Sequence, residues 1–448
     1  MSKSQRGGTP RSGAVPDAQP QFGDQRKYLR NFLLHFRPSV VPERTLKFSF
    51  TWGLGAAATV LVVLLLATGL LLKFVYVPTP DRAYDSILYL NNEVPFGQLL
   101  RNVHRWSGNG LLLVVFLHFL RVVYTGAFHP PRQWNWMVGL LLFAAAILSN
   151  FTGYLLPWDQ VAYWAITIST SMLDYVPGIG TGLKHWLLGG EAPGPASLLN
   201  FYAIHTAILP ILLLFVIPFH FWRIRKANGL VVPRSESEEP GVQGEMVSTV
   251  PHVVVREITI ALAVLATVLA VSMVYNAPLA EQANPGLSPN PTKAPWYFMG
   301  VQELLMHFHP VFALLVIPAV LCAGLFSLPF LPYDATTSGV WFCSSRGRRT
   351  ALIAFAAGAL LTVASVLLDE YSGGLAAGTP GWINSGLFPF LLLVVICTGF
   401  WFTVKKGLGA NNNEAVQALF TLLVSSFAVL TLIGVWFRGS GMQLMWAG

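Results

Sequence analysis

Residues 101–128 read RNVHRWSGNGLLLVVFLHFLRVVYTGAF, an apolar stretch with a histidine towards each end. His104 and His118 are fourteen residues apart, which in an α-helix comes within about 40° of four full turns. Both imidazoles therefore lie on roughly one face, about 21 Å apart along the helix axis. Since roughly 20 helical residues cross a bilayer, the stretch predicts a membrane helix with one polar group near each surface.

A second apolar stretch, Leu198–Trp222, carries a similar pattern. His205 and His220 are fifteen residues apart, which overshoots four turns by about 60°. The two stretches are the second and fourth apolar runs of the chain, so they cross the membrane in the same direction. His104 then lies level with His205, near the outer surface. His118 lies level with His220, near the inner one, and each pair could hold one haem iron from its two axial sides.

Two simpler roles for these histidines compete with haem ligation. A membrane histidine can simply hydrogen-bond to neighbouring carbonyls, but polar groups inside a bilayer are costly, and four at matched depths are harder to explain this way. Zinc is a weaker candidate because neither level offers the usual four ligands. The predicted iron ligands are therefore His104, His118, His205 and His220.

Glycines on the first and third apolar runs echo the histidine spacing, because each run has two glycines fourteen residues apart. Glycine lets backbones approach a flat macrocycle closely, although ordinary helix packing explains any single one. Arginines beside the histidines could pair with haem propionates, with interfacial snorkelling as the alternative. The predicted haem-contacting residues are Gly55, Gly69, Gly139, Gly153, Arg101, Arg105 and Arg121.

The composition is that of a polytopic membrane protein. Of the 448 residues, 54% are hydrophobic and 11% charged, against about 25% charged in soluble proteins. The mean hydropathy is +0.57. We expect an all-α membrane protein with about nine transmembrane helices and an N-terminal four-helix dihaem bundle. The expected spans are Thr51–Val77, His104–Tyr124, Trp136–Leu156, Leu198–Trp222, Ile258–Tyr275, Val311–Leu331, Thr350–Leu368, Leu387–Val404 and Val416–Phe437.

The net charge of +8 reflects membrane topology and does not indicate nucleic acid. If the amino terminus is inside, the inside segments hold 21 of the 28 Lys and Arg residues and the outside segments hold 7. This is the positive-inside pattern. It predicts a cytoplasmic amino terminus and an outside carboxyl terminus.

Composition also divides the chain. A tail rich in Gly, Ser, Pro and Gln is predicted to be disordered, and the basic, aromatic segment Arg26–Lys47 to form a helix on the cytoplasmic surface. A polar linker follows the fourth span, and a proline-rich outside loop, Asn276–Pro310, separates spans five and six. The predicted parts are the tail 1–25, the surface helix and dihaem bundle 26–226, the cytoplasmic linker 227–250, a three-span part 251–370 and two additional spans in 371–448.

Three motifs resemble cytochrome b of the cytochrome bc family. They are the segment 101–128, GYLLPWDQ (Gly153–Gln160) and FYAIHT (Phe201–Thr206), closest to the plastid and cyanobacterial type. The resemblance covers roughly residues 26–369. It implies two b haems, quinol oxidation outside, quinone reduction inside and coupled proton translocation. It also implies a Rieske iron–sulfur protein, a c-type cytochrome or equivalent subunit, and a homodimeric complex in a prokaryotic cytoplasmic membrane.

The resemblance places quinol between GYLLPWDQ, which contains Tyr154, and the loop that carries Trp296 and Tyr297. The family's Pro-Glu-Trp-Tyr motif is Ala-Pro-Trp-Tyr here, so its glutamate is missing, which favours menaquinol. Glu303 lies six residues after Tyr297, about 9 Å along a helix, and could supply the missing proton acceptor. The alternative is that Glu303 only caps or solvates the loop.

The inner site and the covalent haem also follow from the resemblance. PHVVVREI (Pro251–Ile258) resembles the segment that supplies an acidic residue for quinone reduction, although an ordinary basic inside loop explains it equally well. The plastid type carries a cysteine for a third, covalent haem where this chain has Gly53, and none of its three cysteines forms a Cys-x-x-Cys pair, so no covalent haem is expected. The predicted inner residues are Arg225, Lys226, Arg256 and Glu257.

These features predict the cytochrome b subunit of a proton-translocating quinol–cytochrome c oxidoreductase. Two further classes stay open. A dihaem membrane anchor that passes electrons between a dehydrogenase or hydrogenase and quinone would need the four histidines but neither PWDQ nor the Trp-Tyr loop. A secondary transporter would line its path with polar residues and would show no haem bands in a reduced-minus-oxidised spectrum.

Overall fold

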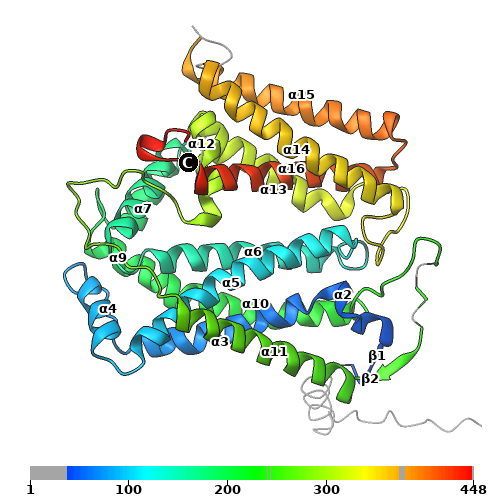
Figure 1. Cartoon of the computed structure of the whole chain (residues 1–448), viewed down its shortest axis with the longest axis horizontal. Helices are drawn as coiled ribbons and strands as arrows, with labels where there is room; N and C mark the ends of the chain where they lie inside the picture. The colour runs from blue at the N-terminus through cyan, green and yellow to red at the C-terminus, as the bar shows by residue number, and fades with distance from the viewer. Residues whose placement is uncertain (1–37, 240, 243, 373–378, 446–448) are drawn as a thin grey trace, which may run out of the picture.

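The computed structural model describes residues 38–239, 241–242, 244–372 and 379–445. The regular structure of this part is helical, apart from one small two-stranded sheet (Figure 1). Nine helices in the described part are long and apolar enough to cross a membrane, which confirms the all-α polytopic fold. The spans are α3 Leu54–Leu72, α5 Gly97–Tyr124, α6 Gln133–Tyr154, α9 and α10 over Pro195–Lys226, α11 Thr249–Val274, Phe312–Phe330 with α13 Ile317–Ser327, Ser345–Tyr371 within α14 Ser345–Ser372, Ile383–Gly407 with α15 Phe388–Phe402, and α16 Asn412–Trp436.

The spans form two adjoining groups (Figure 1). In one, α3, α5, α6 and α10 pack together, and α11 lies along α3 and α5. Leu61, Leu111 and Ala146 are buried there beside Val268 of α11. The first span after the linker is therefore part of the same group as the N-terminal bundle.

In the second group, α16 packs along α14 and against the short helix α12, Met299–His307. Small residues permit the close approach. A Cβ at Gly358 of α14 would lie 2.5 Å from the Leu422 carbonyl oxygen, and one at Gly300 of α12 would lie 2.7 Å from the Phe427 ring. The last span thus directly supports the helix that follows Tyr297.

The prediction of a surface helix over Arg26–Lys47 is wrong for its described part. Residues 38–47 contain strand β1, Val40–Pro42, and a short 3₁₀ turn, because β1 pairs antiparallel with strand β2, Met246–Ser248, of the linker. Arg44 also donates hydrogen bonds of 3.0 and 2.7 Å to the Glu238 carboxylate. The predicted tail and residues 26–37 lie outside the described residues.

Candidate functional site

The outer histidines face each other. His104 of α5 and His205, between α9 (Pro195–Ala203) and α10 (Leu209–Lys226), have ring centres 6.2 Å apart and planes 80° apart. An imidazole nitrogen binds a metal at about 2.0 Å, with the ring centre about 1.1 Å behind it, so two rings opposed across one metal have centres about 6 Å apart. The outer pair has this spacing. Among the described residues, no three His, Cys, Asp or Glu side chains gather to hold a metal ion, so the donor set is a pair of imidazoles.

Two threonines fix the tautomer of the outer pair. The Thr68 hydroxyl lies 2.9 Å from His104 Nδ1 and donates its hydrogen to the Leu64 carbonyl, 2.6 Å away. Because a hydroxyl has one hydrogen, its oxygen must accept from Nδ1–H. Thr152 binds His205 Nδ1 in the same way at 3.2 Å while donating to its own helix. Both Nε2 atoms then keep a lone pair for a metal.

His205 lies within a short π-helical turn, Ile204–Ile208. Such a turn adds one residue to an α-helix and occurs often at functional sites. The extra residue accounts for the spacing of fifteen between His205 and His220, against fourteen on α5. It removes the overshoot that a regular helix would give, so the two helices present their histidines in register.

The predicted glycines each face a different histidine. Glycine at these positions leaves the space beside an imidazole open, where a side chain would fill it. A Cβ added to each glycine would lie close to the Cε1 atom of one imidazole. The distances are 3.1 Å from Gly69 to His104, 2.6 Å from Gly153 to His205, 3.8 Å from Gly55 to His118 and 3.7 Å from Gly139 to His220. The glycine pairs that are fourteen residues apart in the sequence therefore make the same kind of contact, each glycine with one imidazole.

The inner pair is His118 of α5 and His220 of α10, and Arg121 follows His118 by three residues. His118 and His220 interact electrostatically, and His220 Nδ1 is buried with no hydrogen-bond partner among the described residues. Arg121 is only 6% exposed; its Nε donates to the Phe50 carbonyl at 3.1 Å, whereas its Nη2 has no partner in the described part. This free donor fits an acidic group such as a propionate. It borders a cavity of about 500 Å³ lined by Ser49, Trp52, Leu117, Leu120, Arg121, Tyr124, Trp341, Phe342 and Arg348.

The two outer arginines differ. Arg101 donates to the carbonyls of Ala277 and Pro278 at 2.9 and 2.6 Å, so it holds the segment that follows α11. The Arg105 guanidinium carbon lies 5.3 Å from the centre of the Tyr154 ring, and Nε of Arg105 is buried without a partner in the described part. Arg105 therefore keeps a donor that a ligand could use.

The PWDQ motif ties the end of α6 to the proline-rich loop. Asp159 caps α7, Gln160–Ser171, by accepting from the Ala162 amide at 2.9 Å, and its other oxygen accepts from the Ala280 amide at 2.9 Å. Burial raises the pKa of Asp159, and these two hydrogen bonds oppose that rise. Together with Arg101, the motif holds the loop over the N-terminal end of α5 and the C-terminal end of α6.

The same loop brings the predicted aromatic residues to that end. Trp296 Nε1 donates to Asn109 Oδ1 at 3.2 Å. Tyr297 packs against the core of α3, α5, α6 and α11, and its hydroxyl is buried without a partner among the described residues. Burial raises the pKa of Tyr297, whereas the nearby Arg105 charge acts to lower it and Tyr154 to raise it. Tyr154, Arg105 and Tyr297 are thus neighbours.

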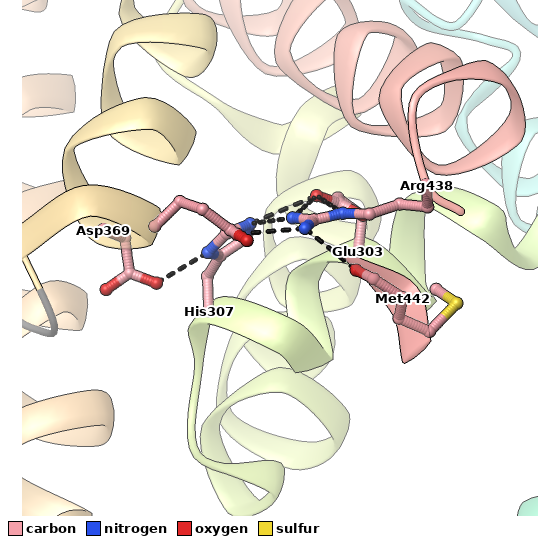
Figure 2. Close-up of polar contacts among 6 residues, drawn as sticks. Glu303, His307, Asp369, Arg438 and Met442 are labelled. Atoms are coloured by element: carbon pink, nitrogen blue, oxygen red, sulfur yellow. Dashed lines mark hydrogen bonds and ion pairs between the residues drawn. The ribbon is translucent and has the colours of Figure 1, made fainter. Parts of the chain in front are cut away.

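Glu303 occupies a separate charged cluster (Figure 2). It is fully buried, which excludes the alternative that it is solvated. Arg438 donates to both of its oxygens at 2.6 to 3.1 Å, and His307 Nε2 lies 3.2 Å from Oε1. Burial would raise the pKa of Glu303, but hydrogen bonds from His307 and Arg438 outweigh it and lower that pKa. The sequence offers His307, one helical turn after Glu303, together with Gln302 as the nearest polar alternatives to Glu303, but it gives no local signal for Arg438.

The inner residues lie at the ends of two helices. Arg225 and Lys226 end α10, with Lys226 Nζ 5.3 Å from the Trp222 ring centre. Arg256 and Glu257 belong to α11, where Arg256 donates to the carbonyl of residue 252 at 2.8 Å. The contacts of Lys226 and Arg256 are therefore local to their own helices.

Known proteins resemble this chain in sequence and fold. A family model for cytochrome b/b6/petB matches residues 41–228. Cytochrome b6 of Acaryochloris marina is 40% identical over 173 residues, 39% of this chain and 80% of the relative, and that of Rippkaea orientalis is 40% identical with 78% covered. A solved chain described as hyperthermophilic respiratory Complex III shares the fold, with a TM-score of 0.63 and 22% identity over 93% of this chain and 96% of that one. The chain therefore belongs to the cytochrome b/b6 family.

Proposed function

We propose that this member of the family is the cytochrome b subunit of a quinol–cytochrome c oxidoreductase type complex. It would hold one b haem between His104 and His205 and a second between His118 and His220. The observation that carries the proposal is the outer pair, whose ring centres are 6.2 Å apart and whose Nδ1 atoms are both bound by threonines.

When bound, haem supplies one-electron transfer, here along the membrane normal. Residues of this chain would orient the haem and pair with its negatively charged propionates. Thr68 and Thr152 keep the outer imidazoles in the tautomer that binds metal, and the four facing glycines leave room beside each ring. Arg105 and Arg121 each keep a buried hydrogen-bond donor that could bind a haem propionate.

Quinol oxidation is assigned to the outer ends of α5 and α6. The Tyr297 hydroxyl and Arg105 Nε are buried donors without partners in the described part, beside Tyr154 and with Trp296 at the rim. They suit the oxygens of a quinol head group. Glu303, the buried carboxylate on the helix directly after Tyr297, would accept a proton. The missing motif glutamate favours menaquinol.

The remaining assignments are made by family resemblance. Quinone reduction is placed inside, near Arg225, Lys226, Arg256 and Glu257. The complex would be a homodimer with a Rieske iron–sulfur protein and a c-type cytochrome or equivalent, in a prokaryotic cytoplasmic membrane with the amino terminus inside. A cytoplasmic reporter fused after the last residue should then be silent. No covalent haem is assigned, because Gly53 stands where the plastid type carries the cysteine.

Haem spectra of the purified complex test the ligand assignment. Replacing His104 or His205 by Leu should remove one haem, and replacing His118 or His220 should remove the other. A single haem in the unmodified protein, or a loss pattern that pairs His104 with His118, would contradict the assignment. Inhibition by quinol-site blockers separates this function from that of a dihaem anchor.

Turnover of a Glu303→Gln variant tests the proton acceptor. The change keeps the shape of the side chain but removes the base, so quinol oxidation should slow strongly with both haem spectra intact. Because the change also weakens the ion pair with Arg438, a Glu303→Gln/Arg438→Gln double variant serves as the control. Near-normal turnover of the single variant would exclude Glu303.

A further inference from the structure

The cluster around Glu303 carries an excess of negative charge. It joins Glu303 and His307 of α12, Asp369 and Glu370 of α14, and Arg438, which follows α16 (Figure 2). The cluster contains three carboxylates and one guanidinium, so its formal charge is −2 with a neutral imidazole and −1 with a protonated one. Such a cluster favours the uptake of one proton.

His307 bridges two carboxylates that differ in exposure. Its Nε2 lies 3.2 Å from Glu303 Oε1, and its Nδ1 lies 2.7 Å from Asp369 Oδ2. The side chains are 0% exposed at Glu303, 10% at His307 and 39% at Asp369. One ring therefore connects a carboxylate that water does not reach to one that it does.

The surroundings of Nε2 accommodate both of its protonation states. The Arg438 Nη2 atom lies 3.4 Å away and can only donate, which requires Nε2 without a hydrogen. The Glu303 carboxylate can only accept, which requires Nε2–H. Burial lowers the pKa of His307, but hydrogen bonds to Glu303 and Asp369 outweigh it and raise that pKa. Either form of the ring thus has a partner.

We infer that His307 relays the quinol proton from Glu303 to Asp369. The inference rests on the proposed function, in which Glu303 takes that proton from the quinol hydroxyl. The O–H bond on Glu303 breaks as an N–H bond forms at Nε2, and the Nδ1–H bond breaks as an Asp369 oxygen gains the proton and passes it to water. Rotation of the side chain that exchanges the positions of the two nitrogens then turns the bare nitrogen towards Glu303 and the N–H group towards Asp369, ready for the next proton. No electrons move in this step.

A matched pair of variants tests the relay in the full complex. His307→Gln keeps a polar side chain but cannot titrate, whereas His309→Gln changes a neighbouring histidine whose ring lies 6.3 Å from that of Tyr175, outside the cluster. We expect His307→Gln to lower quinol turnover by about 100-fold, with an unchanged KM for quinol and intact haem spectra. Added imidazole should restore part of the rate. His309→Gln should behave as the unmodified complex.

The outcomes separate the relay from the function on which it rests. If Glu303→Gln is slow and His307→Gln turns over normally, Glu303 stays the proton acceptor and the relay is refuted. If His307→Gln is slow but imidazole does not help, and KM rises or haem is lost, the residue is structural and the relay is again refuted. Asp369→Asn changes a carboxylate that is 39% exposed and should give a smaller decrease in turnover than His307→Gln. An equal rate in Asp369→Asn and the unmodified complex would refute the relay to Asp369.

Discussion

Replacing Thr152 by Val should weaken the outer haem site without disturbing the inner one. Valine has nearly the shape of threonine but lacks the hydroxyl that lies 3.2 Å from His205 Nδ1. The substitution removes one hydrogen-bond acceptor of the buried His205 imidazole, which also has a hydrogen bond with the Ser149 backbone. The same change at Thr68 removes the 2.9 Å contact with His104.

The magnitude follows from the lost hydrogen bond. Loss of such outer-sphere contacts usually lowers metal affinity about 10–100-fold. The imidazole also becomes a poorer electron donor, so oxidised iron is less stabilised and the midpoint potential of the outer haem should rise. A tenfold change in the ratio of the binding affinities for oxidised and reduced iron corresponds to a shift of about 59 mV for one electron.

Redox titration of the purified complex measures the effect, with the inner haem as an internal reference. Thr152→Val should raise the potential of the outer haem by tens of millivolts and lower its retention on dilution, while the inner haem keeps its potential. An unchanged outer potential, or an equal shift of both haems, would refute the argument that these threonines fix the histidine tautomer.

Three further outcomes are expected. Gly153→Ala should lose the outer haem, because its Cβ would lie 2.6 Å from His205 Cε1, whereas Gly139→Ala, at 3.7 Å from its histidine, should keep the inner haem; absorbance per mole of protein measures both. Haem staining after denaturing electrophoresis should leave this chain blank. Hydrogen bonding to Arg44 lowers the pKa of Glu238 to about 2. The ion pair between Glu238 and Arg44 therefore stabilises the fold fully above the unfolded pKa of glutamate, near 4.3, and this stabilisation is lost as the pH falls towards 2. The distance between spin labels on β1 and the linker should accordingly stay constant from pH 7 to 5 and increase near pH 2.

The spans and the histidine pairing could be predicted from sequence, because both depend on regular helical periodicity. A continuous apolar run shows a membrane helix, and two such runs with matched polar positions indicate which side chains meet. The spacing of Gly69 and Gly153 was informative for the same reason. In contrast, β1 was mistaken for part of a helix, because its pairing partner lies about 200 residues later and leaves no local pattern.

The contacts that complete the site depend on tertiary packing. Thr68 and Thr152 each stand directly before a facing glycine, and this Thr-Gly repeat was the signal available for them. Arg438 is 135 residues from Glu303, so no periodicity connects the two. The last span, expected only as an additional helix, supplies the segment that brings this arginine to the cluster.

The π-turn at Ile204–Ile208 has a consequence for comparing relatives. A search that demands the same number of residues between the paired histidines of both helices would discard this chain, although its imidazoles are in register. A relative lacking the turn should have one residue fewer between them, and an alignment would show a single gap there. Such a gap would mark a change in helix winding and leave the ligands where they are.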